Sequence, residues 1–162
     1  MKRVLASCFG LGRLPIAPGT WGSLPVALAF GLMCHFGASK ASAAIVMAAL
    51  VVVGCVICIT CGPAAIAATR KEDPGEVVAD EFAGQALTFL VGGLGAAVCS
   101  WGGAAAGFIL FRLFDIVKPW PICRFEKLPG AWGVLADDLM AGIYAGIGLL
   151  ILARLWPGAL SA

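Results

Sequence analysis

The sequence predicts an all-α, polytopic integral membrane protein, a helical bundle with about five membrane segments. Hydrophobic residues make up 61% of the 162 residues and charged residues only 12%, with a mean hydropathy of +1.00, whereas about a quarter of a soluble domain is charged. Three stretches contain no Lys, Arg, Asp or Glu: residues 14–39, 41–69 and 82–111. Each exceeds the ~20 apolar residues that a spanning helix needs. Because no linker or low-complexity tract interrupts them, residues 1–162 are expected to form a single membrane-embedded domain.

The first two charge-free stretches each predict one helix. Glycines and prolines in FGLGRLPIAPGTWGS, residues 9–23, are expected to keep residues 10–19 as a loop, with Thr20 or Ser23 capping the helix that follows. Backbone N–H groups at such a helix start can bind an anion. The second stretch contains CVICITC, residues 55–61, whose three cysteines lack a fourth nearby ligand. They are expected to pack in the span rather than hold an iron–sulfur cluster, and nothing requires a disulfide.

The third stretch, residues 82–111, is about 45 Å long as one helix, too long for a ~30 Å hydrocarbon core and somewhat short for two crossings. If the chain turns near Ser100–Gly103, nine Lys and Arg residues lie on one side and two on the other. A single crossing gives six against five. The positive-inside rule favours the turn, so the third and fourth segments should form a short hairpin, with the N-terminus cytoplasmic. A fourth charge-free stretch, residues 139–153, has only 15 residues, but with residues 134–136 before the acidic pair and a snorkelling Arg154 it predicts the fifth segment.

Two acidic pairs and one charged helix stripe reach the side predicted to be cytoplasmic. Taken separately, each is compatible with ordinary charge at a helix end. Taken together, carboxylates ~4 Å apart would repel by about 4 kcal/mol per contact at an effective dielectric constant of 20, and a divalent cation would remove this repulsion. Oxygen ligands without histidine or cysteine suit magnesium. The residues are Asp80 and Glu81 before the third segment, Arg112, Asp115 and Lys118 at the end of the fourth, and Asp137 and Asp138 before the fifth.

Four stretches in succession, FGLGRLPIAPGTWGS, VVADEFAG, FRLFDIVKPWPI and LPGAWGVLADDLMAG, resemble the signature stretches of the phosphatidylglycerophosphatase A family. The resemblance implies an all-helical, Mg²⁺-dependent enzyme of the bacterial inner membrane whose active site faces the cytoplasm. Such an enzyme removes the terminal phosphate of phosphatidylglycerophosphate to give phosphatidylglycerol. Its partners are this lipid and the bilayer, and no nucleic acid is expected. Ala131 departs from the pattern, because many members have a second glycine there.

The resemblance also implies roles for individual residues. Asp80, Asp115 and Asp138 are the expected catalytic residues, with Asp115 either a further metal ligand or the base that orients water. Lipid phosphate would be held by charge-assisted bonds from Arg112 and Lys118 and by backbone donors near Thr20. Attack by water and attack by an aspartate remain alternatives. The expected Mg²⁺ ligands are Asp80, Glu81, Asp137 and Asp138.

Missing motifs exclude other phosphatase chemistries. The one histidine, His35, is expected near the opposite membrane face, Cys8 and Arg13 have four rather than five residues between them, and no Asp-x-Asp occurs. Two alternatives remain. A CDP-alcohol-type lipid phosphotransferase would carry an Asp-x-x-Asp-Gly signature, which is absent. A small membrane transporter would place polar groups near mid-membrane, where the predicted spans are almost purely apolar.

Overall fold

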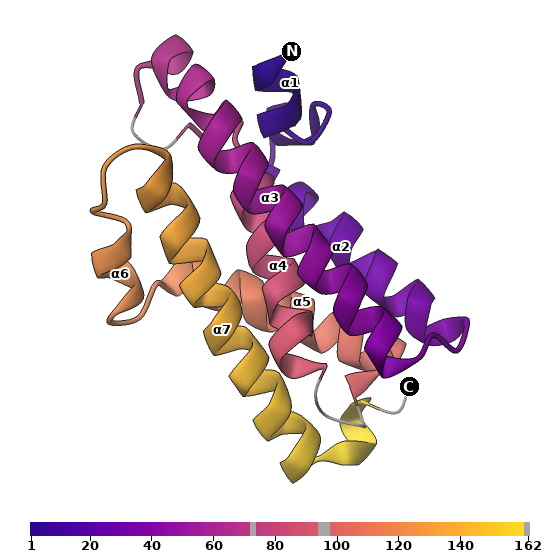
Figure 1. Ribbon diagram of the computed structural model, residues 1–162. Helices are drawn as coiled ribbons and strands as arrows, with labels where there is room; N and C mark the ends of the chain where they lie inside the picture. Colours follow the sequence, from indigo (N-terminus) through magenta and orange to yellow (C-terminus); the bar gives the residue numbers. More distant parts are fainter. Residues whose placement is uncertain (72–73, 94–97, 161–162) are drawn as a thin grey trace.

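The computed structural model describes residues 1–71, 74–93 and 98–160, and this part of the chain contains helices and no strand. The predicted all-α class is therefore confirmed. Helix α4 runs through the middle of the bundle and packs against α2, α3, α5 and α7 (Figure 1). The elements are α1 (Lys2–Ala6), η1 (Leu11–Arg13), α2 (Pro18–His35), α3 (Lys40–Thr69), α4 (Ala79–Gly92), α5 (Trp101–Val117), α6 (Ile122–Phe125), α7 (Ala131–Leu155) and η3 (Pro157–Leu160).

The five long helices follow the order of the predicted segments, but only two of those described, α3 and α7, are long and apolar enough to cross a membrane. Helix α4 has 14 residues, or about 21 Å, and is shorter than a ~30 Å hydrocarbon core. Large apolar side chains are exposed along α3, including Ile45, Val52 and Val56 at 70%, 61% and 53%. Contiguous exposed apolar surface of this kind is typical of a membrane or protein contact, so α3 and α7 are compatible with membrane association.

Glycines allow α4 and α7 to cross closely. A Cβ atom on Gly84 of α4 would lie 2.6 Å from the carbonyl oxygen of Asp138, and one on Gly142 of α7 would overlap the carbonyl oxygen of Gly84. Small residues let helix backbones approach in this way. The crossing brings the first turns of α4 beside the acidic pair of α7.

The N-terminal segment fixes the start of α4. Arg3 donates two hydrogen bonds to the Glu76 carboxylate, at 2.7 and 2.9 Å, and this contact lowers the pKa of Glu76. The backbone N–H of Val78, the residue before α4, donates to the carbonyl of Ala6 at 3.0 Å. These contacts join the N-terminus to the loop that leads into α4.

The predicted position of the hairpin turn is wrong. Helix α4 ends at Gly92 and α5 begins at Trp101, because Ser100 caps α5 by accepting a 2.9 Å hydrogen bond from the N–H of Gly103. The connection between the two helices therefore ends before Trp101, and residues 94–97 lie outside the described part of the chain.

Two predicted helix starts are also wrong. Helix α2 begins at Pro18, a favoured residue for a first helical position, after Ala17 with a φ of 50°. Thr20 and Ser23 therefore lie inside α2, where Ser23 bonds back to the carbonyl of Gly19 at 2.8 Å, and neither caps the helix. Helix α7 begins at Ala131, so its acidic pair lies in the second turn rather than before the helix.

The cysteines lie in three kinds of surroundings, and one of them, Cys123, is an exposed free thiol. As predicted, Cys58 and Cys61 pack in an apolar cluster that joins α3 to α1, α4 and α7. Cys34 at the end of α2 and Cys99 before α5 form a disulfide that the sequence did not predict. An odd number of cysteines, seven, gives no indication of which two would pair.

Replacing Cys34 and Cys99 with alanine should lower the stability of the folded protein. The bridge joins positions 65 residues apart, and disulfides over long loops typically contribute about 2–4 kcal/mol. The expected result is a lower midpoint of thermal unfolding in detergent, measured beside a Cys123→Ala control at an exposed free thiol. An unchanged midpoint would show that the bridge does not restrain the bundle.

Candidate active site

Three carboxylates meet where α4 and α7 cross. Asp80 and Glu81 come from the first turn of α4 and Asp138 from the second turn of α7, and each offers an oxygen within 4.8 Å of the others. Asp80 and Asp138 are almost inaccessible, at 3% and 4%. Burial raises the pKa of Glu81 to about 8; Asp138 and Asp115 also raise it, while Asp80 and Arg112 lower it. We call Asp80, Glu81 and Asp138 the carboxylate triad.

Asp137 lies outside this group, although it is the immediate neighbour of Asp138. Its carboxylate accepts a 2.6 Å hydrogen bond from the ammonium group of Lys118, which also lies 3.5 Å from Glu126. Burial lowers the pKa of Lys118, but the hydrogen bond and charge of Asp137 outweigh it and raise the pKa above its ordinary value. Lys118 therefore stays protonated beside Asp137.

Helix α5 places a second cation at the site. The guanidinium of Arg112 lies 2.6 Å from the Asp115 carboxylate, in a pair whose side chains are only 18% and 12% exposed. Asp115 also interacts electrostatically with Glu81 and Asp138. Of the predicted stripe, Arg112 and Asp115 thus border the triad directly, whereas Lys118 faces Asp137.

The start of α2 also borders the site, next to Glu81 and Arg112. A Cβ atom on Gly19 would overlap Oε1 of Glu81 and would lie 2.8 Å from Nη1 of Arg112. Thr20 follows in the same turn and is half-buried. The N-terminus of α2 therefore lies next to Glu81 and Arg112, and a helix N-terminus is an ordinary binding place for anions.

Two buried residues at the site were not predicted from the sequence. Gly19 touches both a triad carboxylate and Arg112, and Gln85 is fully buried one turn after Glu81. The only signal for Gln85 was an amide within an otherwise apolar stretch.

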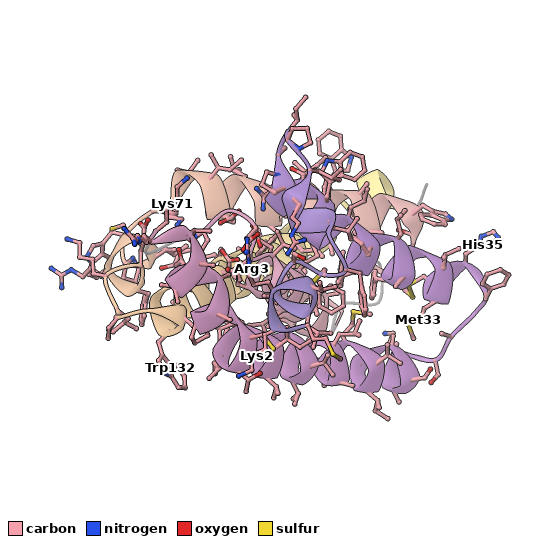
Figure 2. All side chains as sticks on the ribbon, turned by 90° about the horizontal axis from the view of Figure 1, so that it is seen from above. Lys2, Arg3, Met33, His35, Lys71 and Trp132 are labelled. Atoms are coloured by element: carbon pink, nitrogen blue, oxygen red, sulfur yellow. A yellow bond between two sulfur atoms is a disulfide. The ribbon has the colours of Figure 1, made fainter. Side chains whose placement is uncertain are left out.

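His35 lies at the end of the molecule remote from Lys71 and Trp132 (Figure 2).

The arrangement suits two kinds of ligand. Three converging carboxylates with no imidazole or thiolate among them provide the hard oxygen donors that Mg²⁺ prefers. Beside them, Arg112 and the start of α2 supply donors and positive charge of the type that binds phosphate oxygens. A divalent cation and a phosphate group could therefore be held next to each other.

Comparison with known proteins gives consistent similarities. Residues 4–153 match the family model described as Phosphatidylglycerophosphatase A. The chain is 34% identical to phosphatidylglycerophosphatase A of Escherichia coli K12 over 95% of its own length and 84% of the relative's, and 38% identical to the Haemophilus influenzae protein of the same name over 89% and 83%. It is also 34% identical to a putative phosphatidylinositol-3-phosphatase of Bacteroides thetaiotaomicron, over 93% and 92%. No solved structure matches the chain.

Proposed function

Because the chain belongs to the phosphatidylglycerophosphatase A family and is a phosphatase, we propose that it hydrolyses phosphatidylglycerophosphate to phosphatidylglycerol and phosphate, with Mg²⁺ as cofactor. The observation that carries the proposal is the carboxylate triad beside Arg112. A phosphate monoester carries about −1.5 to −2 charges near neutral pH, so its hydrolysis needs positive charge placed around the transferring group.

The carboxylate triad is the proposed Mg²⁺ site. Asp80, Glu81 and Asp138 offer oxygens within 4.8 Å of one another, and no nitrogen or sulfur ligand belongs to the group. Bound Mg²⁺ would neutralise charge on the phosphate oxygens. Asp137, expected from the sequence to be a further ligand, accepts its hydrogen bond from Lys118 in the structure. We therefore assign Asp137 to holding Lys118 in place.

The cations of α5 are the proposed phosphate-binding groups. Arg112 lies against both the triad and the N-terminus of α2, where its guanidinium could hold phosphate oxygens beside the positive end of the helix dipole. The N–H of Thr20, expected from the sequence to lie among the phosphate donors, already donates to the carbonyl of Ala17 at 3.0 Å. Lys118, protonated and supported by Asp137, would add a further contact. Asp115 orients Arg112 through their 2.6 Å ion pair and is the nearest candidate to accept a proton from attacking water.

The position of the disulfide supports a site on the cytoplasmic face of the inner membrane. Gly19 at the site and Cys34 at the disulfide are 15 residues apart on α2, a separation of about 22 Å. Disulfides persist in oxidising compartments such as the periplasm, so the end that carries the site would face the reducing cytoplasm. The positive-inside bias of the sequence favours the same orientation.

Cys123 provides a test of this orientation. It is an exposed free thiol on α6, the short helix between Lys118 and the start of α7. A membrane-impermeant maleimide is expected to label it only after the inner membrane of the cell is permeabilised, with Cys123→Ala as the control for background. Full labelling in intact cells would place the site on the periplasmic face.

Phosphate release by the purified protein in detergent tests the function. Phosphatidylglycerophosphate is the expected substrate, with release that depends on added Mg²⁺ and stops with chelator. Phosphatidylinositol 3-phosphate is the comparison substrate, because one relative is named for it. Faster release from the inositol lipid, or none from either lipid at any Mg²⁺ concentration, would contradict the proposal.

Gly19→Ala should inactivate the enzyme with little loss of fold. The new methyl group would meet Oε1 of Glu81 and the guanidinium of Arg112, and small displacements of catalytic groups cost roughly 10²-fold in rate. Gly148→Ala is the matched control, because its Cβ would meet nothing closer than 3.6 Å and alanine favours a helix. Turnover and thermal midpoint are measured for both variants. Equal turnover in the two variants would show that the start of α2 is not part of the active site.

A further inference from the structure

Gln85 is a buried polar residue for which the described contacts provide no hydrogen bond. Its side chain is 0% exposed, and neither Nε2 nor Oε1 has a partner within the described part of the chain. Leaving a buried polar group unpaired costs about 1–3 kcal/mol, and folded proteins pair nearly all such groups. A partner for this amide could become available in another state of the site.

Gln85 lies on the same face of α4 as Glu81, one turn further along the helix. Glu81 lies one turn before it and Phe89 one turn after, so the three side chains share one face of the helix. Glu81 lies beside Arg112 of α5, and Phe89 stacks on Phe30 of α2 with ring centroids 4.3 Å apart. Helix spacing therefore places Gln85 between Glu81 and Phe89, on the face of α4 that borders α2 and α5.

Three other buried atoms, all of Glu81 and Arg112, lack a hydrogen-bond partner among the described residues, and one of them is Nη1 of Arg112, which lies 2.6 Å from Asp115. The other two complement the amide. Oε2 of Glu81 is a buried acceptor without a donor, and Nε of Arg112 is a buried donor without an acceptor. An amide has both an NH₂ donor and a carbonyl acceptor, so one glutamine can satisfy both atoms at once. A carboxylate could not donate to Glu81, and a lysine could not accept from Arg112.

We propose that Gln85 is a positioning residue: Nε2 donates to Oε2 of Glu81 when the site binds its cation, and Oε1 accepts from Nε of Arg112 when the site also binds phosphate. The inference rests on the proposed function, because it assigns a metal ligand and a phosphate-binding group to the residues that Gln85 holds. The bridge fixes the direction of the Glu81 carboxylate and of the Arg112 guanidinium together. It also couples binding of the cation to binding of the phosphate.

Gln85→Met tests this role, because methionine fills a similar volume without a strong hydrogen-bonding group. Outer groups that orient a metal ligand typically change metal affinity or activity by about 10–100-fold. We expect Mg²⁺ affinity, measured by calorimetry without substrate, and kcat to fall within that range. The thermal midpoint of the metal-free protein should stay the same or rise, since an unpaired buried amide has been removed.

Thr88→Val is the matched control. Thr88 is also fully buried on α4, and its hydroxyl already donates to the carbonyl of Gly84 at 3.1 Å. It should keep the Mg²⁺ affinity and kcat of the wild type. Gln85→Leu repeats the removal of the amide if the methionine variant does not fold.

Wild-type Mg²⁺ affinity and kcat in Gln85→Met would overturn the proposal, as would a lower midpoint with Mg²⁺ affinity unchanged, the result of a purely structural role. Calorimetry separates this inference from the function itself. A wild-type protein that binds Mg²⁺ but does not hydrolyse phosphatidylglycerophosphate would refute the proposed substrate, while weaker Mg²⁺ binding by Gln85→Met would still support positioning of Glu81.

Discussion

Asparagine in place of Asp138 is expected to reduce phosphate release by on the order of 10³-fold or more. Asp138 is one of three carboxylates with oxygens within 4.8 Å of one another, and it is 4% exposed. Asparagine keeps the shape of the side chain but removes the negative charge. Charge stabilisation by a bound metal contributes several kcal/mol, and each 1.36 kcal/mol is a factor of ten in rate.

The variant should fold, because it removes a charge from a crowded acidic group. Glu76→Gln is the matched control: it makes a similar carboxylate-to-amide change at the ion pair with Arg3, outside the triad. Loss of this ion pair should lower the thermal midpoint but leave the three triad carboxylates unchanged. Turnover is measured over a range of Mg²⁺ concentrations, with thermal midpoints for both proteins. Wild-type turnover in Asp138→Asn would show that the triad does not take part in the reaction.

The sequence predicted that acidic residues of the candidate site would converge, as Asp80, Glu81 and Asp138 do, but it did not predict the partners of the individual residues. Charged residues at the ends of apolar segments on one side of the membrane indicated that Asp80 and Asp138 would approach each other. Successive side chains of a helix point about 100° apart, so an adjacent acidic pair can face two partners. Asp138 faces the triad and Asp137 faces Lys118. Sequence spacing alone could not decide which member of the pair would face which partner.

The helix packing that brings the acidic residues together could not be predicted from the sequence either. Gly84 and Gly142 allow α4 and α7 to touch, but small residues are common throughout an apolar chain with 22 glycines. The turn between α4 and α5 was placed too late, because Ser100 acts as a helix cap rather than as part of a turn. Segment order could be predicted from charge and hydropathy, whereas close crossings and caps depend on neighbouring backbone.

Arg112→Gln is the second change with a large expected effect, a decrease in turnover of roughly 10²–10³-fold, the usual result of losing one preorganised donor. Arg112 lies against Glu81, Asp115 and the start of α2, where it could hold charge that develops on the phosphoryl group. Arg124→Gln is the control, because Arg124 is an exposed cation on α6. It should change turnover little.

Asp115→Asn tests the same pair from its acidic side and should abolish turnover while the protein still folds. The carboxylate would no longer orient Arg112 at 2.6 Å or accept a proton.

The double variant Arg112→Gln/Asp115→Asn separates the chemical role from a structural one, because residues in contact show non-additive effects when they act on each other. If the two residues only neutralise each other in a buried pair, the neutral double variant should regain turnover that each single variant lost. If they act on the phosphate and on water, the double variant should be at least as inactive as Asp115→Asn. Phosphate release at saturating Mg²⁺ is measured for the two single variants and the double variant. Recovery of turnover in the double variant would show that Arg112 and Asp115 take no direct part in the reaction.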